Sequence, residues 1–182
     1  MRGGELNDRL VEDLRARRSE VIGELLAIYG RQIQGVAYLV VGSHADAEEI
    51  VIDTVLSAWQ HADQLRAPGA LTWLLRIATR HALSRRRTSH HVDPLFDDVA
   101  TVPEPGIDRV ALLMALDQLT PPVRAAIVLH YFAGLTVEET ASALGKAANT
   151  VKTQLHDGLR GLRSQLASDD WPEGDPSEGH RD

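Results

Sequence analysis

Apolar residues recur every three or four positions along most of this chain, which is the spacing of amphipathic helices. The longest such run, interrupted once by Gln32, consists of Val21, Leu25, Ile28, Val36 and Leu39. It predicts one long helix with these side chains on its buried face. We expect Gly42 to end this helix, because glycine readily adopts the left-handed conformation found at helix C-termini.

Two more helices are predicted before residue 90. Ser43 with Asp46 resembles a capping box that has Asp in place of Glu, so a helix is expected from there to about His61. The buried side of that helix is expected to include Ile50, Leu56 and Trp59. Pro68 is acceptable in a first helical turn, and we therefore predict a third helix over residues 69–88.

The second part of the chain predicts four shorter helices, over residues 108–118, 121–132, 137–143 and 148–166. Thr120 is placed to cap the second of them, and Pro121 suits its first turn. Thr136 with Glu139 forms a full capping box for the third. No window alternates with period two for long enough to predict a strand.

The predicted fold class is therefore all-α, with two small helical domains at residues 19–91 and 108–167. Between them, residues 92–107 hold three prolines, four acidic residues and no basic one, which is typical of a flexible acidic linker. Residues 1–18 form an N-terminal extension. Residues 168–182 are polar and rich in Pro and Gly, so we expect an acidic, disordered tail.

Composition excludes several classes of function. The chain of 182 residues has no cysteine, which rules out disulfides, thiolate nucleophiles and cysteine-bound metal centres. It has no apolar run of about 20 residues that could span a membrane and no signal-peptide pattern, so we expect a cytoplasmic protein. The net charge is −7. Because phosphate neutralisation supplies most non-specific DNA affinity, we expect the isolated protein to bind nucleic acid weakly.

The third predicted helix carries a basic surface. Six arginines and no acid lie between Gln64 and Val92. Projected as a helix, the face opposite the apolar one carries Trp73, Arg76, Arg80, Ser84 and Arg87. A tryptophan beside arginines can stack on an unpaired base while guanidinium groups hold phosphates. The alternative is a solvated helix end whose tryptophan lies in the core.

The last two predicted helices have the layout of a helix-turn-helix, with a turn at residues 144–146. Four leucine and valine residues give the long helix an inner face: Val151, Leu155, Leu159 and Leu162. Outward positions suited to bases and phosphates are Thr150, Thr153, Gln154 and Asp157, flanked by Lys152, His156 and Arg160. Asp157 repels phosphates unless it accepts a hydrogen bond from a cytosine amino group or turns to a basic neighbour. Gly158 and Gly161 each cost this helix up to about 1 kcal/mol relative to alanine.

Both halves resemble the sigma-70 family of bacterial RNA polymerase sigma factors, in its extracytoplasmic-function (ECF) group. DAEEIVIDTVLSAW at residues 46–59 and TWLLRIATRHALS at residues 72–84 are similar to the two motif helices of sigma region 2. LTPPVRAAIVLHYFAGLTVEETASALGKAANTVKTQLHDGLRGLR at residues 119–163 is similar to region 4. The order of the two motifs makes this resemblance more specific than a single helix-turn-helix.

The resemblance implies a role for each surface. The 46–59 helix would dock on the clamp of the largest subunit of core RNA polymerase, with Asp46, Glu48, Glu49 and Asp53 as polar contacts. The 63–69 loop and the next helix would read and melt the minus-ten element through Arg66, Trp73, Arg76, Arg80, Ser84 and Arg87. The last helix would read the minus-thirty-five element through Thr150, Lys152, Thr153, Gln154, His156 and Arg160. The partners that the resemblance implies for the whole protein are core RNA polymerase, promoter DNA and an anti-sigma factor, with no membrane insertion.

Two other interpretations remain open from the sequence. One is a stand-alone helix-turn-helix regulator that binds duplex DNA without polymerase, and the other is a sigma-like adaptor that no longer initiates transcription. We assign no catalytic residues, no cofactor and no metal. His81, His90 and His91 lie close together in the chain, but the sequence contains no HExxH or other ligand pattern.

Overall fold

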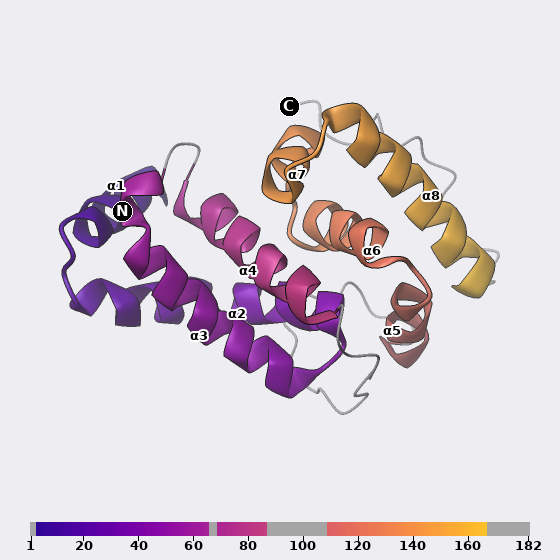
Figure 1. Cartoon of the computed structure of the whole chain (residues 1–182), viewed down its shortest axis with the longest axis horizontal. Helices are drawn as coiled ribbons and strands as arrows, with labels where there is room; N and C mark the ends of the chain where they lie inside the picture. The colour runs from indigo at the N-terminus through magenta and orange to yellow at the C-terminus, as the bar shows by residue number, and fades with distance from the viewer. Residues whose placement is uncertain (1–2, 66–68, 87–108, 167–182) are drawn as a thin grey trace.

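The computed structural model describes residues 3–65, 69–86 and 109–166, and all regular elements in these ranges are helical (Figure 1). The elements are α1 (Gly3–Arg15), α2 (Glu20–Val41), α3 (His44–Gln60), the 3₁₀ turn η1 (Ala62–Gln64), α4 (Ala70–Arg86), α5 (Arg109–Asp117), α6 (Pro121–Ile127), the π-type segment η2 (Val128–Phe132), α7 (Val137–Leu144) and α8 (Ala148–Leu166). The all-α prediction is confirmed. The predicted linker, the predicted tail, Arg66 and Arg87 lie outside the described residues.

Three helices, α2, α3 and α4, pack on one another as the core of the N-terminal half. Gly42 ends α2 in the left-handed conformation, with φ of 80°, and its N–H donates to the Tyr38 carbonyl. The Ser43 hydroxyl then accepts a hydrogen bond from the Asp46 N–H at 3.3 Å and so caps α3. The predicted boundary between these helices is confirmed.

Two predictions about burial are wrong. Leu56 of α3 is 48% exposed and Ile28 of α2 is 41% exposed. Ile50 is fully buried as predicted, whereas Trp59 is partly buried. The apolar period therefore identified the helices, but neighbouring helices cover a narrower strip of each than the sequence suggested.

Helix α1, in the segment that the sequence left as an extension, packs against α2, η1 and α4. Leu10 and Leu14 are fully buried there. Beyond α1, Arg17 adopts a left-handed backbone conformation and donates hydrogen bonds to the carbonyls of Trp59 and Gln60, at 2.6 and 3.2 Å. Its guanidinium lies 5.8 Å from the centre of the Trp59 ring. The extension thus supplies a cation to the C-terminal end of α3.

The C-terminal half is built from α5 to α8, and α8 packs on α5, α6 and α7. The full capping box at the start of α7 is confirmed, with reciprocal bonds between Thr136 and Glu139 at 2.9 and 3.1 Å. Helix α6 begins at Pro121 as expected, although the Thr120 side chain makes no capping bond. The four predicted inner residues of α8 are all buried: Val151, Leu155, Leu159 and Leu162.

The two halves contact each other mainly where α4 meets α6 and α7. Arg124 of α6 is fully buried and donates to the Leu39 carbonyl of α2. Arg86 of α4 is also buried and donates to the Val41 carbonyl at 2.9 Å. Both guanidinium groups pair with the Asp117 carboxylate of α5. Two cations and one anion therefore link α2 and α4 of the N-terminal half to α5 and α6 of the C-terminal half.

Candidate functional site

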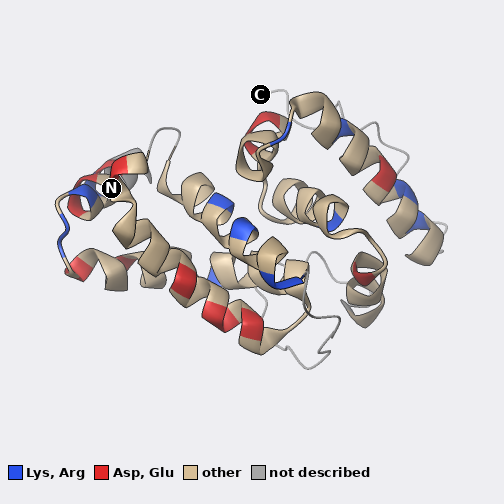
Figure 2. Cartoon of the chain, viewed as in Figure 1, with Lys and Arg blue, Asp and Glu red and all other residues tan. Residues whose placement is uncertain are grey.

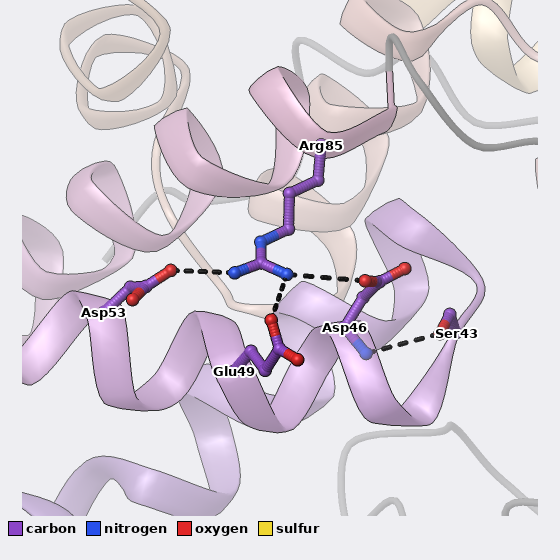
Figure 3. Close-up of polar contacts among 5 residues, drawn as sticks. All are labelled: Ser43, Asp46, Glu49, Asp53 and Arg85. Carbon is purple, nitrogen blue, oxygen red and sulfur yellow. Dashed lines mark hydrogen bonds and ion pairs between the residues drawn. The ribbon is translucent and has the colours of Figure 1, made fainter.

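Four acidic residues that the sequence assigns to polymerase binding lie along α3 (Figure 2). Three of them surround one guanidinium, that of Arg85 in the last turn of α4 (Figure 3). Arg85 donates to Asp46 at 3.4 Å, to Glu49 at 2.5 Å and to Asp53 at 2.9 Å. Glu48 instead lies 3.3 Å from the His44 ring. The structure thus brings three predicted residues together and adds a cation to them.

This cluster carries more negative than positive charge, since three carboxylates share one guanidinium. The pKa of Arg85 is raised by its hydrogen bonds to Glu49 and Asp53, which outweigh the opposing effect of burial. All four side chains keep between 30 and 64% of their surface exposed to solvent. An approaching basic protein surface can therefore reach these carboxylates directly.

Two apolar residues that sequence reasoning missed share the exposed face of α3 with these acids. Ile52 is 57% exposed and Leu56 is 48% exposed. They follow Glu48 at intervals of four residues, which places all three on one side of the helix. An exposed strip of acidic and apolar side chains is suited to docking against a basic and apolar protein surface. Helical projection of the sequence could have revealed this strip, because residues 48, 52 and 56 are in register.

Some, but not all, of the residues predicted to form the basic surface of α4 are exposed to solvent. Arg76, Arg80 and Ser84 are exposed, whereas Trp73 is partly buried against the core. The indole therefore lies between the two alternatives that the sequence left open, with part of its surface accessible beside the arginines. Arg85, counted with this basic stretch in the sequence, turns toward α3 instead.

Helix α8 presents the predicted polar face with one exception. Its exposed members are Thr150, Lys152, Thr153, His156 and Arg160. Gln154 is only partly exposed, and its Oε1 atom is buried without a hydrogen-bond partner. Of the two alternatives for Asp157, the structure shows the turn to a basic neighbour, because the Asp157 carboxylate lies 3.1 Å from the Arg160 guanidinium. Its repulsion of phosphates is thereby reduced.

The histidines described by the structure have local partners. His81 lies 3.1 Å from the Ser57 hydroxyl, and His130 lies 2.7 Å from the Leu135 carbonyl. Within the described ranges, no three His, Cys, Asp or Glu side chains converge as a metal site would require. None of the described helices combines the length and apolarity needed to cross a membrane.

Comparisons with known proteins match both halves. Residues 25–91 match the family model for sigma-70 region 2, and residues 109–162 match the model for sigma-70 region 4. The chain is 33% identical over 136 residues to the ECF RNA polymerase sigma factor SigL of Mycobacterium tuberculosis, covering 69% of this chain and 77% of that protein. It is 30% identical over 179 residues to the ECF RNA polymerase sigma factor SigK of Mycobacterium bovis, covering 87% and 96%.

Two solved structures share the fold. One is the sigma factor RpoE in complex with the anti-sigma factor NepR from Bartonella quintana, with a TM-score of 0.65, 24% identity and coverage of 81% of this chain and 96% of that chain. The other is CnrH in complex with the cytosolic domain of CnrY, with a TM-score of 0.69, 22% identity and coverage of 90% and 99%. These likenesses extend over both halves of the chain.

Proposed function

Since this chain belongs to the ECF group of the sigma-70 RNA polymerase sigma factors, we propose that it binds core RNA polymerase, directs it to specific promoters and helps to open the DNA there. One observation carries this proposal: region 2 and region 4 follow each other on one chain that aligns with ECF relatives. The protein then acts with polymerase in the bacterial cytoplasm, as an initiation factor without a catalytic step of its own.

The alternative was a stand-alone helix-turn-helix regulator. Such a protein needs no region 2, yet residues 25–91 match that region and present an acidic and apolar face on α3. A regulator that binds DNA by itself also relies on a strongly basic surface, whereas this chain has a net charge of −7. Both observations favour the sigma factor.

We propose that residues 19–91 hold the polymerase contact and read the minus-ten element, while residues 108–167 read the minus-thirty-five element. On α3, the polymerase contact consists of the four predicted acids together with Ile52 and Leu56. The acids attract a basic surface, and the two apolar side chains lose water when the surfaces meet. This combination explains why exposed apolar residues stand beside charges.

A substitution at Ile52 tests this contact. Ile52→Glu removes apolar burial and adds a charge to be desolvated, so we expect the affinity for core polymerase to fall at least tenfold. Ile28→Glu is the matched control, because Ile28 is an exposed isoleucine on a different helix, α2. Equal affinities for the two variants in a fluorescence anisotropy titration with core polymerase would exclude this face of α3.

On the DNA side, we propose that Arg76, Arg80 and Ser84 hold the minus-ten strand while the accessible part of Trp73 stacks on an unpaired base. The exposed threonines and cations of α8 enter the major groove of the minus-thirty-five element. Because Gln154 is half-buried, Thr153 is the better placed of these two residues for a base contact. Arg66 and Arg87 remain proposed minus-ten contacts.

Run-off transcription tests the whole proposal. Purified core polymerase is assayed with and without this protein on a library of promoter fragments. Initiation at specific sites that depends on the protein is the expected result. Tight duplex binding without any initiation would favour the stand-alone regulator, and polymerase binding without initiation would favour a sigma-like adaptor.

We also propose that an anti-sigma protein is among its partners, because the RpoE relative was solved in complex with one. Such a partner would suppress run-off transcription when added in equimolar amount to the purified protein. Suppression that persists when the protein is in large excess would instead indicate an effect on polymerase.

A further inference from the structure

Arg85 occupies a position where two proposed surfaces meet. It belongs to the last turn of α4, the helix that we assign to the minus-ten element, but its guanidinium points to α3 (Figure 3). There it contacts carboxylates from successive turns, those of Asp46, Glu49 and Asp53. These are three of the four acids that we assign to polymerase binding.

A cation that contacts an acid reduces what that acid offers to another cation. Arg85 donates from both of its terminal nitrogens to the three carboxylates, at 2.5 to 3.4 Å. Basic residues of a partner would have to share the same oxygens or displace the guanidinium. Because ion pairs between solvent-exposed side chains are weak, basic residues of a partner can displace the Arg85 guanidinium at a small cost in free energy.

We propose that Arg85 is an internal competitor of core polymerase for the acids of α3, and so lowers the affinity of this protein for polymerase. This inference rests on the proposed function. Without the Arg85 charge, the three carboxylates act at full strength on a basic partner, which raises both the electrostatic attraction and the association rate. Arg85 is thus an affinity-setting residue rather than a contact.

The alternative role for Arg85 is to position the acids. In that case its removal would disorder the carboxylates and weaken polymerase binding. The two roles predict opposite changes in the affinity for core polymerase when Arg85 is replaced, so measuring that affinity separates them.

The first experiment is a titration of core polymerase with the full chain and its Arg85→Gln variant, at low and high salt. We expect the variant to bind about two- to tenfold more tightly at low salt, with the difference shrinking as salt rises. Arg85→Lys keeps the charge and is expected to bind like the wild type. Arg31 is an exposed residue of a different helix, α2, so Arg31→Gln makes the same change in net charge away from the acids of α3 and is expected to leave the affinity unchanged.

A pair of adjacent glutamates provides a sharper control. Glu48 and Glu49 have similar side-chain exposures, 59 and 64%, but only Glu49 of the two contacts Arg85. We expect Glu49→Gln to weaken polymerase binding more when residue 85 is Gln than when it is Arg. Glu48→Gln is expected to cost the same in both backgrounds.

Weaker binding by Arg85→Gln would overturn competition in favour of positioning, and unchanged binding would show that polymerase does not use these oxygens. Additive effects of Glu49→Gln and Arg85→Gln would also overturn the proposal. The wild-type titration separates these outcomes from a failure of the proposed function. If the wild type binds polymerase and initiates transcription, the proposed function stands whatever the Arg85 variants do.

Discussion

Replacing Gly158 with alanine sets two physical effects against each other. In the middle of an exposed helix, Gly→Ala is stabilising by up to about 1 kcal/mol, because glycine loses more backbone freedom on folding. Gly158 lies instead where α8 packs on α6 and is buried. A Cβ atom there would lie 2.6 and 2.8 Å from the Cγ1 and Cδ1 atoms of Ile127, and 3.0 Å from Val123 Cγ1.

The steric effect is expected to prevail. Ile127 is 1% exposed, so its side chain has little room to move away from the new methyl group. Overpacking of a dense core costs about 1 to 3 kcal/mol, which exceeds the gain in helix propensity. We therefore expect Gly158→Ala to lower the free energy of unfolding by about 1 kcal/mol.

Gly161 is the matched control on the same helix. A Cβ atom there would meet a single side-chain atom within 4 Å, Leu119 Cδ2 at 2.9 Å. That atom is the far end of a flexible, partly buried side chain, so a small rotation relieves the contact. Gly161→Ala is expected to be neutral or to stabilise the protein by up to about 1 kcal/mol.

Urea unfolding followed by circular dichroism measures both variants against the wild type. The cause is tested by Ile127→Ala, which removes the two closest carbons and should make Gly158→Ala neutral or favourable in that background. A Gly158→Ala protein that is as stable as Gly161→Ala, or a cost that is unchanged in the Ile127→Ala background, would refute the steric explanation.

Further predictions concern charged residues and DNA contacts. Asp117→Asn is expected to destabilise the protein by about 2 kcal/mol, because it weakens two charged hydrogen bonds. Burial raises the pKa of Asp117, but the hydrogen bond to Arg86 and the charges of Arg86 and Arg124 outweigh it and hold this pKa below its usual value. The difference in unfolding free energy between variant and wild type, measured by urea unfolding, should therefore shrink as pH falls below about 4. Arg17→Ala should lower the melting temperature by a few degrees by removing the contacts with Trp59, whereas a fully wild-type melting curve would show that they contribute nothing. Arg80→Ala is expected to reduce promoter opening, seen by permanganate footprinting, more than polymerase binding; equal losses would contradict a minus-ten role. Substitutions at Thr153 should change the preferred minus-thirty-five sequence in a promoter library, and an unchanged preference would exclude it from base contact.

The sequence was sufficient for several features whose determinants are local, although the predicted cap at Thr120 makes no capping bond. Gly42 and the Thr136–Glu139 capping box mark helix ends through their own backbone preferences, and the structure confirms both. The inner face of α8 was also predictable, because Val151 and its partners repeat at helical spacing. Local rules failed where burial depends on which neighbour covers a helix. Leu56 belongs to an apolar period and is nevertheless exposed, since no described helix covers that side of α3.

Pairing between distant charges was beyond sequence reasoning for a related reason. The acids of α3 were predicted as a polymerase contact, and that role stays a prediction. Nothing in their spacing indicated that Arg85, about thirty to forty residues later, would lie among them. Counting charge along the chain assigned this arginine to a basic surface, whereas in the folded protein its charge belongs to the acidic one.

The buried arginines show why such pairing arises. Helix α2 has no basic residue in its last turn, and the last carbonyls of a helix lack partners within it. Arg124 and Arg86 supply those partners from two other helices, at Leu39 and Val41, and place positive charge at the negative end of the α2 dipole. Arg17 does the same for α3, which also ends without a basic residue of its own. A rule that assigns arginine to solvent fails at Arg86 and Arg124, because the terminal carbonyls of α2 come within reach of these side chains only after the helices have assembled.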